Sequence, residues 1–297
     1  MKNKKMGFIG SPIYMAICIA LLLIVSLVLL SDYFQKRAAQ RQIEEASNEV
    51  EIVQESEPEE TEPSEIGEEQ EREEVSPIEI AIDFDGLHEV NQDIFSWVFV
   101  PGTDISYPVL QSPEELDTDY YLNTNLDGST GYPGCIYIQK RNHQDFTDPL
   151  TVLYGHNMKN GTMFANLHYY EDETFFQENP YIYVSTEEGT LAFRIFAAVW
   201  YDNRLILDYY KDFADEGSLT EFLDSLSNYP GNFNSEITVD ERMDTVIGLS
   251  TCVAQRPNER FYVFGKKLSD DEIREISAED IQKVKDMAAG ESEDDAP

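Results

Sequence analysis

Hydrophobic and polar positions divide the chain into three parts. Residues 6–30 are almost wholly apolar, residues 44–74 are dominated by Glu with Pro, Ser and Gln, and short apolar runs bounded by turn residues begin near residue 80. The apolar run 13–30 is long enough to cross about 30 Å of hydrocarbon as a helix. The glutamate-rich stretch cannot bury enough apolar surface to offset the entropy of ordering, so it is expected to be disordered.

These patterns predict five segments. They are a short cytoplasmic N-terminus at 1–12, a transmembrane signal-anchor at 13–30, an acidic disordered spacer at 31–79, one folded domain at 80–290 and an acidic tail at 291–297. Like charges along the spacer repel and extend it, so we interpret it as a tether that holds the folded domain off the membrane. A segment that binds a partner is the alternative interpretation.

The folded domain alternates short runs rich in β-branched and aromatic residues with Gly, Pro, Asn and Asp. Such runs are typical of strands. The predicted strands are 105–110, 134–139, 150–156, 181–186, 190–201, 245–253 and 260–268. Many short strands with few long helices favour a barrel or a sandwich, mainly β with some helix, over a doubly wound sheet.

Three segments of the domain have helical periodicity. Apolar residues three or four apart predict a helix over 85–100. A second helix is predicted over 217–228, with Ser218 as its N-cap, inside a long connection of the kind that is more often functional than idle. A third is predicted to begin at Ser269 and to stop at Gly290.

Charge limits the partners and the topology. The formal net charge is -37, which argues against nucleic acid or anionic lipid as a partner, since both require basic patches. The apolar run leads into SDYFQKR rather than into small residues, which favours a retained anchor over a cleaved signal. Basic residues flank both ends of the run, so their charges alone do not orient it. Because long domains translocate largely regardless of charge, we expect a single-pass type II protein of the cell membrane with an extracellular domain.

Cysteine usage is sparse. Cys18 lies in the predicted anchor, which leaves Cys135 and Cys252 for the exported part. Two cysteines are no disulfide framework, although a single Cys135–Cys252 bridge is arithmetically possible. The chain has no CxxC, HExxH, GxGxxG or P-loop pattern, so we expect neither a metal nor a cofactor.

Cys252, at the end of a predicted strand, is a candidate nucleophile. A thiol needs a nearby base or cation to react as thiolate. The four histidines are His88, His143, His156 and His168. Only His156 comes directly off a buried-looking strand into a glycine-bearing corner. Arg260 opens the strand that follows Cys252, and its guanidinium suits a developing oxyanion. Arg256 is a competitor, but it lies in the turn and has less reason to be fixed.

Several segments, in order, resemble the sortases, cysteine transpeptidases of Gram-positive surfaces, and class B in particular. They are GTDISYPVLQ, YYLNTNLDGSTGYPGCIYIQKRN, LYGHNMKNGTMF, LSTC and RFYVFGKKL. The resemblance runs over about 86–267. It implies an eight-stranded sortase-type β-barrel with Cys252 as nucleophile, His156 as general acid/base and Arg260 as the oxyanion and substrate-carbonyl donor.

The resemblance also implies substrates. Cys252 would cleave a C-terminal sorting motif of surface proteins after Thr, and His156 would protonate the departing amine. An amine of a peptidoglycan precursor or of a pilin lysine would then resolve the thioester. Ser250 and Thr251 keep the family's residues and are candidates to line the motif groove, and Asn123 is a further candidate.

Two positions depart from the family pattern. Gly248 stands where relatives often have Thr, and Val253 stands where some class B members have an acid.

Two alternative functions stay open. One is a non-catalytic membrane-anchored barrel that binds an extended peptide, and the other is another cell-wall cysteine transpeptidase. An L,D-transpeptidase has a Ser-x-Gly pattern before its cysteine, which LSTCV lacks. A cysteine phosphatase needs Arg six positions after the cysteine, and position 258 is Asn.

Overall fold

The computed structural model describes residues 18–27, 30, 31, 34, 37, 38, 41, 78, 80, 82–253 and 256–288. The predicted N-terminus 1–12, most of the spacer 31–79 and the tail 291–297 lie outside these residues, as do residues 13–17, 28 and 29 of the predicted anchor. Within the described part, no helix combines the length and the apolar character that a membrane crossing requires.

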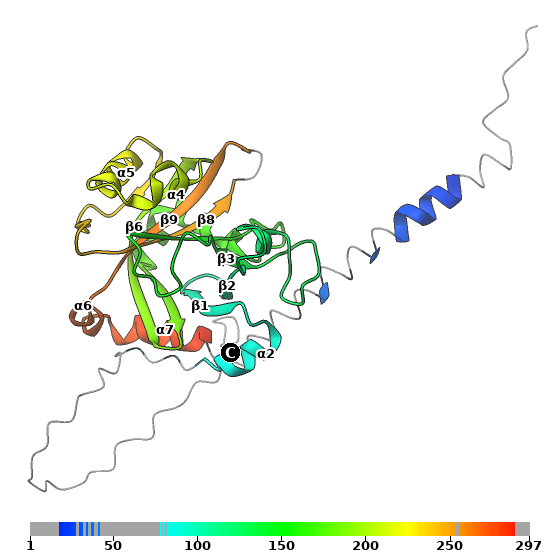
Figure 1. Cartoon of the computed structure of the whole chain (residues 1–297), viewed down its shortest axis with the longest axis horizontal. Coiled ribbons are helices and arrows are strands. Elements are labelled where there is room, and N and C mark those ends of the chain that lie inside the picture. The colour runs from blue at the N-terminus through cyan, green and yellow to red at the C-terminus, as the bar shows by residue number, and fades with distance from the viewer. Residues whose placement is uncertain are drawn as a thin grey trace, which may run out of the picture.

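The described residues form one mixed sheet that closes on itself (Figure 1). Its strands are β1 Ile94–Val100, β2 Ile105–Gln111, β3 Ile136–Ile138, β4 Leu150–Tyr154, β5 Tyr181–Thr186, β6 Gly189–Asp202, β7 Gly231–Phe233, β8 Val246–Cys252 and β9 Glu259–Lys267. The order is β5-β1-β2-β3-β4-β8-β9-β6-β7, and an additional β5–β6 pairing closes a ring of eight strands with β7 attached to β6. The predicted eight-stranded barrel is therefore confirmed.

Two of the strand pairs are parallel, β2 with β3 and β4 with β8, and the other pairs are antiparallel. Parallel neighbours need a crossover connection. The crossover from β4 to β8 contains β5, β6 and the helical segments between β6 and β8. Histidine and cysteine segments that are far apart in the sequence thereby lie on neighbouring strands.

The predicted helix over 85–100 is wrong in its second half. The helix α2 spans only Phe84–Val90, and the residues from Ile94 to Val100 form β1. Asn91 ends the helix, and its side-chain oxygen accepts a hydrogen bond from the Asp93 amide, which turns the chain. The strand β1 is buried on both faces and pairs with both β2 and β5. Its sequence is therefore a continuous apolar run, without the alternation of apolar and polar residues that would distinguish a strand from a helix.

The remaining helical segments are short. They are α3 Glu173–Glu178, α4 Ile206–Tyr209, α5 Ser218–Leu226, α6 Asp270–Arg274 and α7 Ala278–Ala288, with 3-10 turns η1 Tyr120–Leu122, η2 Phe164–Glu171 and η3 Lys211–Phe213. The prediction of Ser218 as N-cap of α5 is wrong. Gly217 occupies that position at φ +87°, and the Glu241 carboxylate accepts from the Gly217 amide at 2.8 Å.

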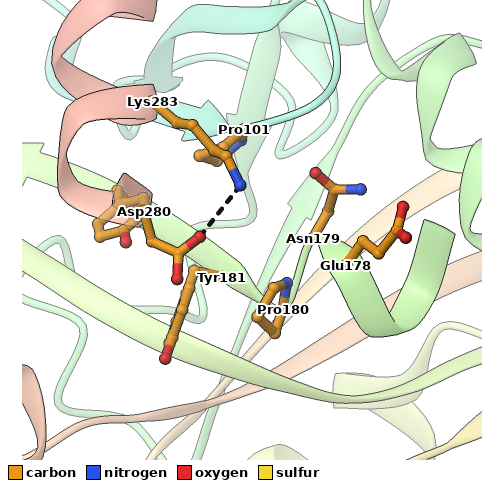
Figure 2. A pocket seen from close by; sticks show the side chains of 8 residues that line it. Pro101, Glu178, Asn179, Pro180, Tyr181, Asp280 and Lys283 are labelled. Carbon is orange, nitrogen blue, oxygen red and sulfur yellow. Dashed lines mark hydrogen bonds and ion pairs between the residues drawn. The ribbon is translucent and has the colours of Figure 1, made fainter. Parts of the chain in front are cut away.

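The single C-terminal helix predicted from Ser269 is divided into α6 and α7. Ser269 caps α6 in a capping box with Glu272, as predicted, and the predicted stop at Gly290 lies outside the described residues. The α7 helix packs against β1, and Val284 enters the core. Figure 2 shows Lys283 of this helix paired with Asp280 above a cavity of about 10 Å³, which has room for a single water molecule.

The barrel has two apolar clusters, one on each face of β8. Inside the barrel, Ile247 and Leu249 pack with residues of η2 and of the strands opposite. On the outer face, Val246 joins Tyr262, Phe264 and side chains of α4 and α5, which cover this side of the barrel. In Figure 1, α4 and α5 lie on the opposite side of the barrel from α2, α6 and α7. The end of β8 therefore emerges next to the α4–α5 layer.

Candidate active site

Strand register brings the three predicted site residues to one rim of the barrel. In the parallel β4–β8 pair, Tyr154 lies opposite Ser250, and His156 and Cys252 each follow two positions later. In the antiparallel β8–β9 pair, Cys252 lies directly opposite Arg260. The β4–β8 ladder continues one residue past the end of β4, because the Gly155 amide donates to the Ser250 carbonyl at 3.1 Å.

The two cysteines of the folded domain are both free and have different surroundings. Cys252 is partly exposed at the end of its strand. Cys135 is buried before β3, where its thiol donates to the Thr124 carbonyl at 3.3 Å and burial raises its pKa. The bridge that the sequence left open is absent, and Cys252 is the accessible thiol of this pair.

His156 is partly buried, and its tautomer is set by a backbone carbonyl. Its Nε2 lies 2.7 Å from the Leu122 oxygen, so Nε2 carries the proton and the neutral ring keeps the lone pair on Nδ1. Burial lowers the pKa of His156, and the Leu122 bond opposes this shift. The Tyr132 ring, with its centroid 4.8 Å from that of His156, covers the imidazole from the loop before β3. The neutral imidazole is therefore favoured.

Arg260 projects beside Cys252 with few competing partners among the described residues. Its Nη1 donates to the Glu259 carbonyl at 3.0 Å and to the Pro257 carbonyl at 3.5 Å. Burial raises the pKa of Tyr137 of β3, whose ring stacks on that of Tyr154 with centroids 5.5 Å apart. The thiol and the guanidinium therefore lie side by side on the paired strands β8 and β9.

Arg256 is held elsewhere, contrary to the expectation that little fixes it. Its guanidinium lies over the Trp200 ring, 4.2 Å from the centroid, and its Nη1 pairs with Glu259 at 3.1 Å. Both contacts hold Arg256 against residues of the paired strands β6 and β9. Arg260, which is paired directly with Cys252, is the better placed of the two cations.

The substrate-binding candidates differ in exposure. Ser250 and Thr251 are buried, and the Thr251 hydroxyl donates to the Gly155 carbonyl at 3.0 Å. Asn123 is exposed and directly follows Leu122, the residue whose carbonyl holds His156. A role in substrate binding stays a prediction for all three.

Sequence reasoning missed a polar cluster behind the nucleophile. Asn157 donates through Nδ2 to the Cys252 carbonyl at 2.9 Å, and the same nitrogen lies 2.9 Å from Nε2 of His168. Glu171 accepts from Nδ1 of His168 at 2.5 Å. The only signal in the sequence was the position of Asn157 next to His156. In the described part of the chain, no group of three His, Cys, Asp or Glu residues is arranged to hold a metal ion.

A family model, related sequences and solved structures all match this chain to the same family. The model of the sortase domain matches residues 98–268. Sortase B of Listeria monocytogenes is 33% identical over 176 residues, which is 59% of this chain and 68% of that protein. Sortase B of Staphylococcus aureus is 30% identical over 170 residues, which is 57% of this chain and 67% of that protein. The crystal structure of Clostridium perfringens sortase B aligns with a TM-score of 0.56 at 28% identity and covers 63% of this chain and 100% of that one.

A closed mixed barrel with a thiol at the end of one strand and an arginine opposite it defines a cysteine transpeptidase, and the chain belongs to the sortase family. Its relatives and structural neighbours are class B sortases. The family match lies within the predicted domain 80–290, whose boundaries stay predictions.

Proposed function

We propose that this sortase cleaves a C-terminal sorting motif of surface proteins after Thr and transfers the acyl group to an amine. The acceptor is an amine of a peptidoglycan precursor or of a pilin lysine. The observation that carries the proposal is the direct pairing of Cys252 with Arg260 beside the loop that bears His156. A covalent intermediate divides one difficult transfer into two easier steps.

In the first step, Nδ1 of neutral His156 accepts the thiol proton, and the Cys252 sulfur attacks the Thr carbonyl carbon. The carbonyl oxygen becomes an oxyanion, which the Arg260 guanidinium stabilises through charge-assisted donors. When the C–N bond breaks, the His156 imidazolium gives its proton to the departing amine, and a Cys252 thioester remains.

In the second step, the acceptor amine attacks the thioester carbonyl and loses its proton to neutral His156. The C–S bond breaks, and the thiolate leaves with its charge near Arg260. The proton on His156 then returns to sulfur, which restores the starting state. Because Nε2 stays bound to the Leu122 carbonyl, Nδ1 is the nitrogen that exchanges protons in both steps.

The proposal includes a membrane anchor at residues 13–30 that holds the domain outside the cell as a type II protein. Residues 18–27 are helical, and their large apolar side chains, among them Leu22 and Leu27, are more than half exposed. Exposed apolar side chains on a helix favour a lipid environment. Membrane fractionation tests this: the full chain should stay in the pellet after a carbonate wash, and Leu22→Arg with Leu27→Arg should release it.

The test of the transfer uses the purified full chain and a library of sorting-motif peptides. Mass spectrometry should find the peptide's N-terminal fragment as a thioester on Cys252, and an added amine should discharge it. A Cys252→Ala chain separates this function from a non-catalytic barrel: a peptide-binding barrel keeps its activity, whereas a transpeptidase loses transfer with its fold intact. Absence of any thioester from the library would contradict the proposal.

A further inference from the structure

The carbonyl of Cys252 is held by a chain of three polar side chains. The Cys252 oxygen only accepts, so the Asn157 amide must point its Nδ2 toward it, at 2.9 Å. Nδ1 of His168 faces the Glu171 carboxylate at 2.5 Å and therefore carries a proton. Nε2 of His168 lies 2.9 Å from the Asn157 nitrogen and 3.2 Å from the Cys252 oxygen, and its lone pair accepts the second Asn157 hydrogen. In this arrangement each side-chain hydrogen of Asn157, and the Nδ1 hydrogen of His168, has an acceptor.

The His168 ring is itself fixed on both sides. It stacks on buried Phe261, with centroids 5.1 Å apart at 26°, and meets the edge of Trp200 at 6.5 Å. Phe261 lies opposite Thr251 in the β8–β9 pair, one position from both Cys252 and Arg260. His168 thus lies across the ends of the two strands that carry the thiol and the guanidinium.

The end of η2 that carries His168 and Glu171 is anchored to the sheet. Asn232 of β7 donates through Nδ2 to the Tyr170 carbonyl at 2.8 Å and to the Glu171 carbonyl at 3.2 Å. The η2 turn also contacts β8 and β9. The chain therefore starts from a fixed point of the barrel and ends at the nucleophile's own peptide group.

We propose that Glu171, His168 and Asn157 are positioning residues that fix the peptide plane of Cys252 and aim its thiol at His156. Asn157 directly follows His156, so one dipeptide presents the base and holds the backbone of the nucleophile. Small displacements of a reacting atom reduce rates steeply. This inference rests on the proposed function, because it assigns the three residues a role in that acyl transfer.

The test compares variants of the full chain by peptide cleavage, with kcat expressed per folded chain as measured by near-UV circular dichroism. His168→Phe keeps the stack on Phe261 but removes both ring nitrogens, and should lower kcat roughly 10- to 100-fold with KM unchanged. His168→Gln can accept from Asn157 and donate to Glu171, and should restore most of the loss. The matched control is His143→Phe, which removes an exposed histidine paired with Asp148 at 2.7 Å and should leave kcat unchanged.

A double-mutant cycle tests whether the residues act as one chain. Asn157→Ala and His168→Phe together should cost no more than the larger single loss, because each breaks the same chain. Three results would each overturn the proposal. They are a double variant whose loss in kcat is the product of the two single losses, a His168→Phe variant whose kcat equals that of the unsubstituted chain, and a change confined to KM. If His168→Phe fails to fold, two substitutions of Glu171 give the same comparison. Glu171→Leu removes the acceptor for Nδ1 of His168 and should lower kcat, whereas Glu171→Gln keeps an acceptor and should retain most of the activity.

A readout without substrate separates this proposal from the proposed function. Iodoacetamide alkylation of Cys252, followed by mass spectrometry of its peptide, needs no sorting motif. His168→Phe should slow it roughly tenfold at neutral pH, because a displaced thiol pairs less well with His156. If the unsubstituted chain forms no thioester with any peptide, the proposed function fails while alkylation still decides the role of the three residues.

Discussion

Cys252 and Arg260 lie directly opposite each other across the β8–β9 pair, on the face of the sheet that α4 and α5 cover. Residues in such positions have their Cβ atoms about 4.5–5.5 Å apart. A register slip of one residue would turn one of them to the interior of the barrel. The geometry of the candidate site is therefore fixed by the backbone ladder.

Removing the nucleophile should abolish chemistry and preserve the fold. Cys252→Ala deletes one partly exposed sulfur that bonds to no other cysteine, so we expect a change in unfolding free energy of less than about 1 kcal/mol. Thioester formation should fall below detection. Chemical denaturation and intact-protein mass spectrometry check the two expectations. Residual acyl transfer by this variant would refute Cys252 as nucleophile.

Arg260 should matter for the transition state more than for the ground state. Arg260→Ala removes the charged fork beside the developing oxyanion and should lower kcat/KM by roughly 100- to 1000-fold. Arg260→Lys keeps the charge without the forked donors, so its kcat/KM should lie between those of the unsubstituted chain and Arg260→Ala. Arg256→Ala is the matched control, because its guanidinium lies over Trp200. Turnover by Arg260→Ala close to that of the unsubstituted chain would remove the oxyanion assignment.

Activity should persist to a more acidic pH than a free imidazole allows. Burial lowers the pKa of His156, so its neutral form survives below the ordinary value of about 6.5. The acidic limb of the kcat/KM profile should therefore lie below that pH. The free energy of unfolding should also decrease as the pH falls through about 6.5. At that pH His156 binds its proton more readily in the unfolded chain than in the folded one, which favours the unfolded state.

The Tyr132 ring provides a direct check on the cause of that shift. Tyr132→Ala uncovers His156 and should move the acidic limb upward toward 6.5, whereas Tyr132→Phe keeps the ring and should leave it in place. A pH series of kcat/KM on the full chain measures both. An unmoved limb in Tyr132→Ala would show that other neighbours of His156 cause the desolvation.

Seven of the nine strands, and the placement of the three candidate residues near strand ends, were predictable because each follows from local sequence; β1 and the short β7 were missed. Turn residues bound the β-rich runs, and Cys252, His156 and Arg260 each stand at the end or the start of one. The first strand, β1, was not predictable, since burial on both faces removes the alternation that marks a strand.

The polar chain behind Cys252 was not predictable for a different reason. Its members are local in sequence to η2 and to His156, but their common target, the Cys252 carbonyl, is 84 and 95 positions away from His168 and Asn157. The parallel β4–β8 pairing brings Asn157 to Cys252, and the contacts of η2 with β8 and β9 bring His168 there. The spacing of these residues in the sequence encodes neither.

Gly248 departs from the family pattern for a packing reason that a substitution can test. A Cβ built there would lie 2.8 Å from Cε1 of Phe264, a fully buried ring that stacks on Tyr262 at 5.3 Å and meets Phe222 at 5.5 Å. Because neighbouring rings confine Phe264, Gly248→Thr should destabilise the fold by about 1–3 kcal/mol through overpacking. Denaturant unfolding should show a lower midpoint, and Phe264→Leu should recover part of the loss in the double variant, although Phe264→Leu alone is destabilising. Strictly additive losses would contradict the steric account of this glycine.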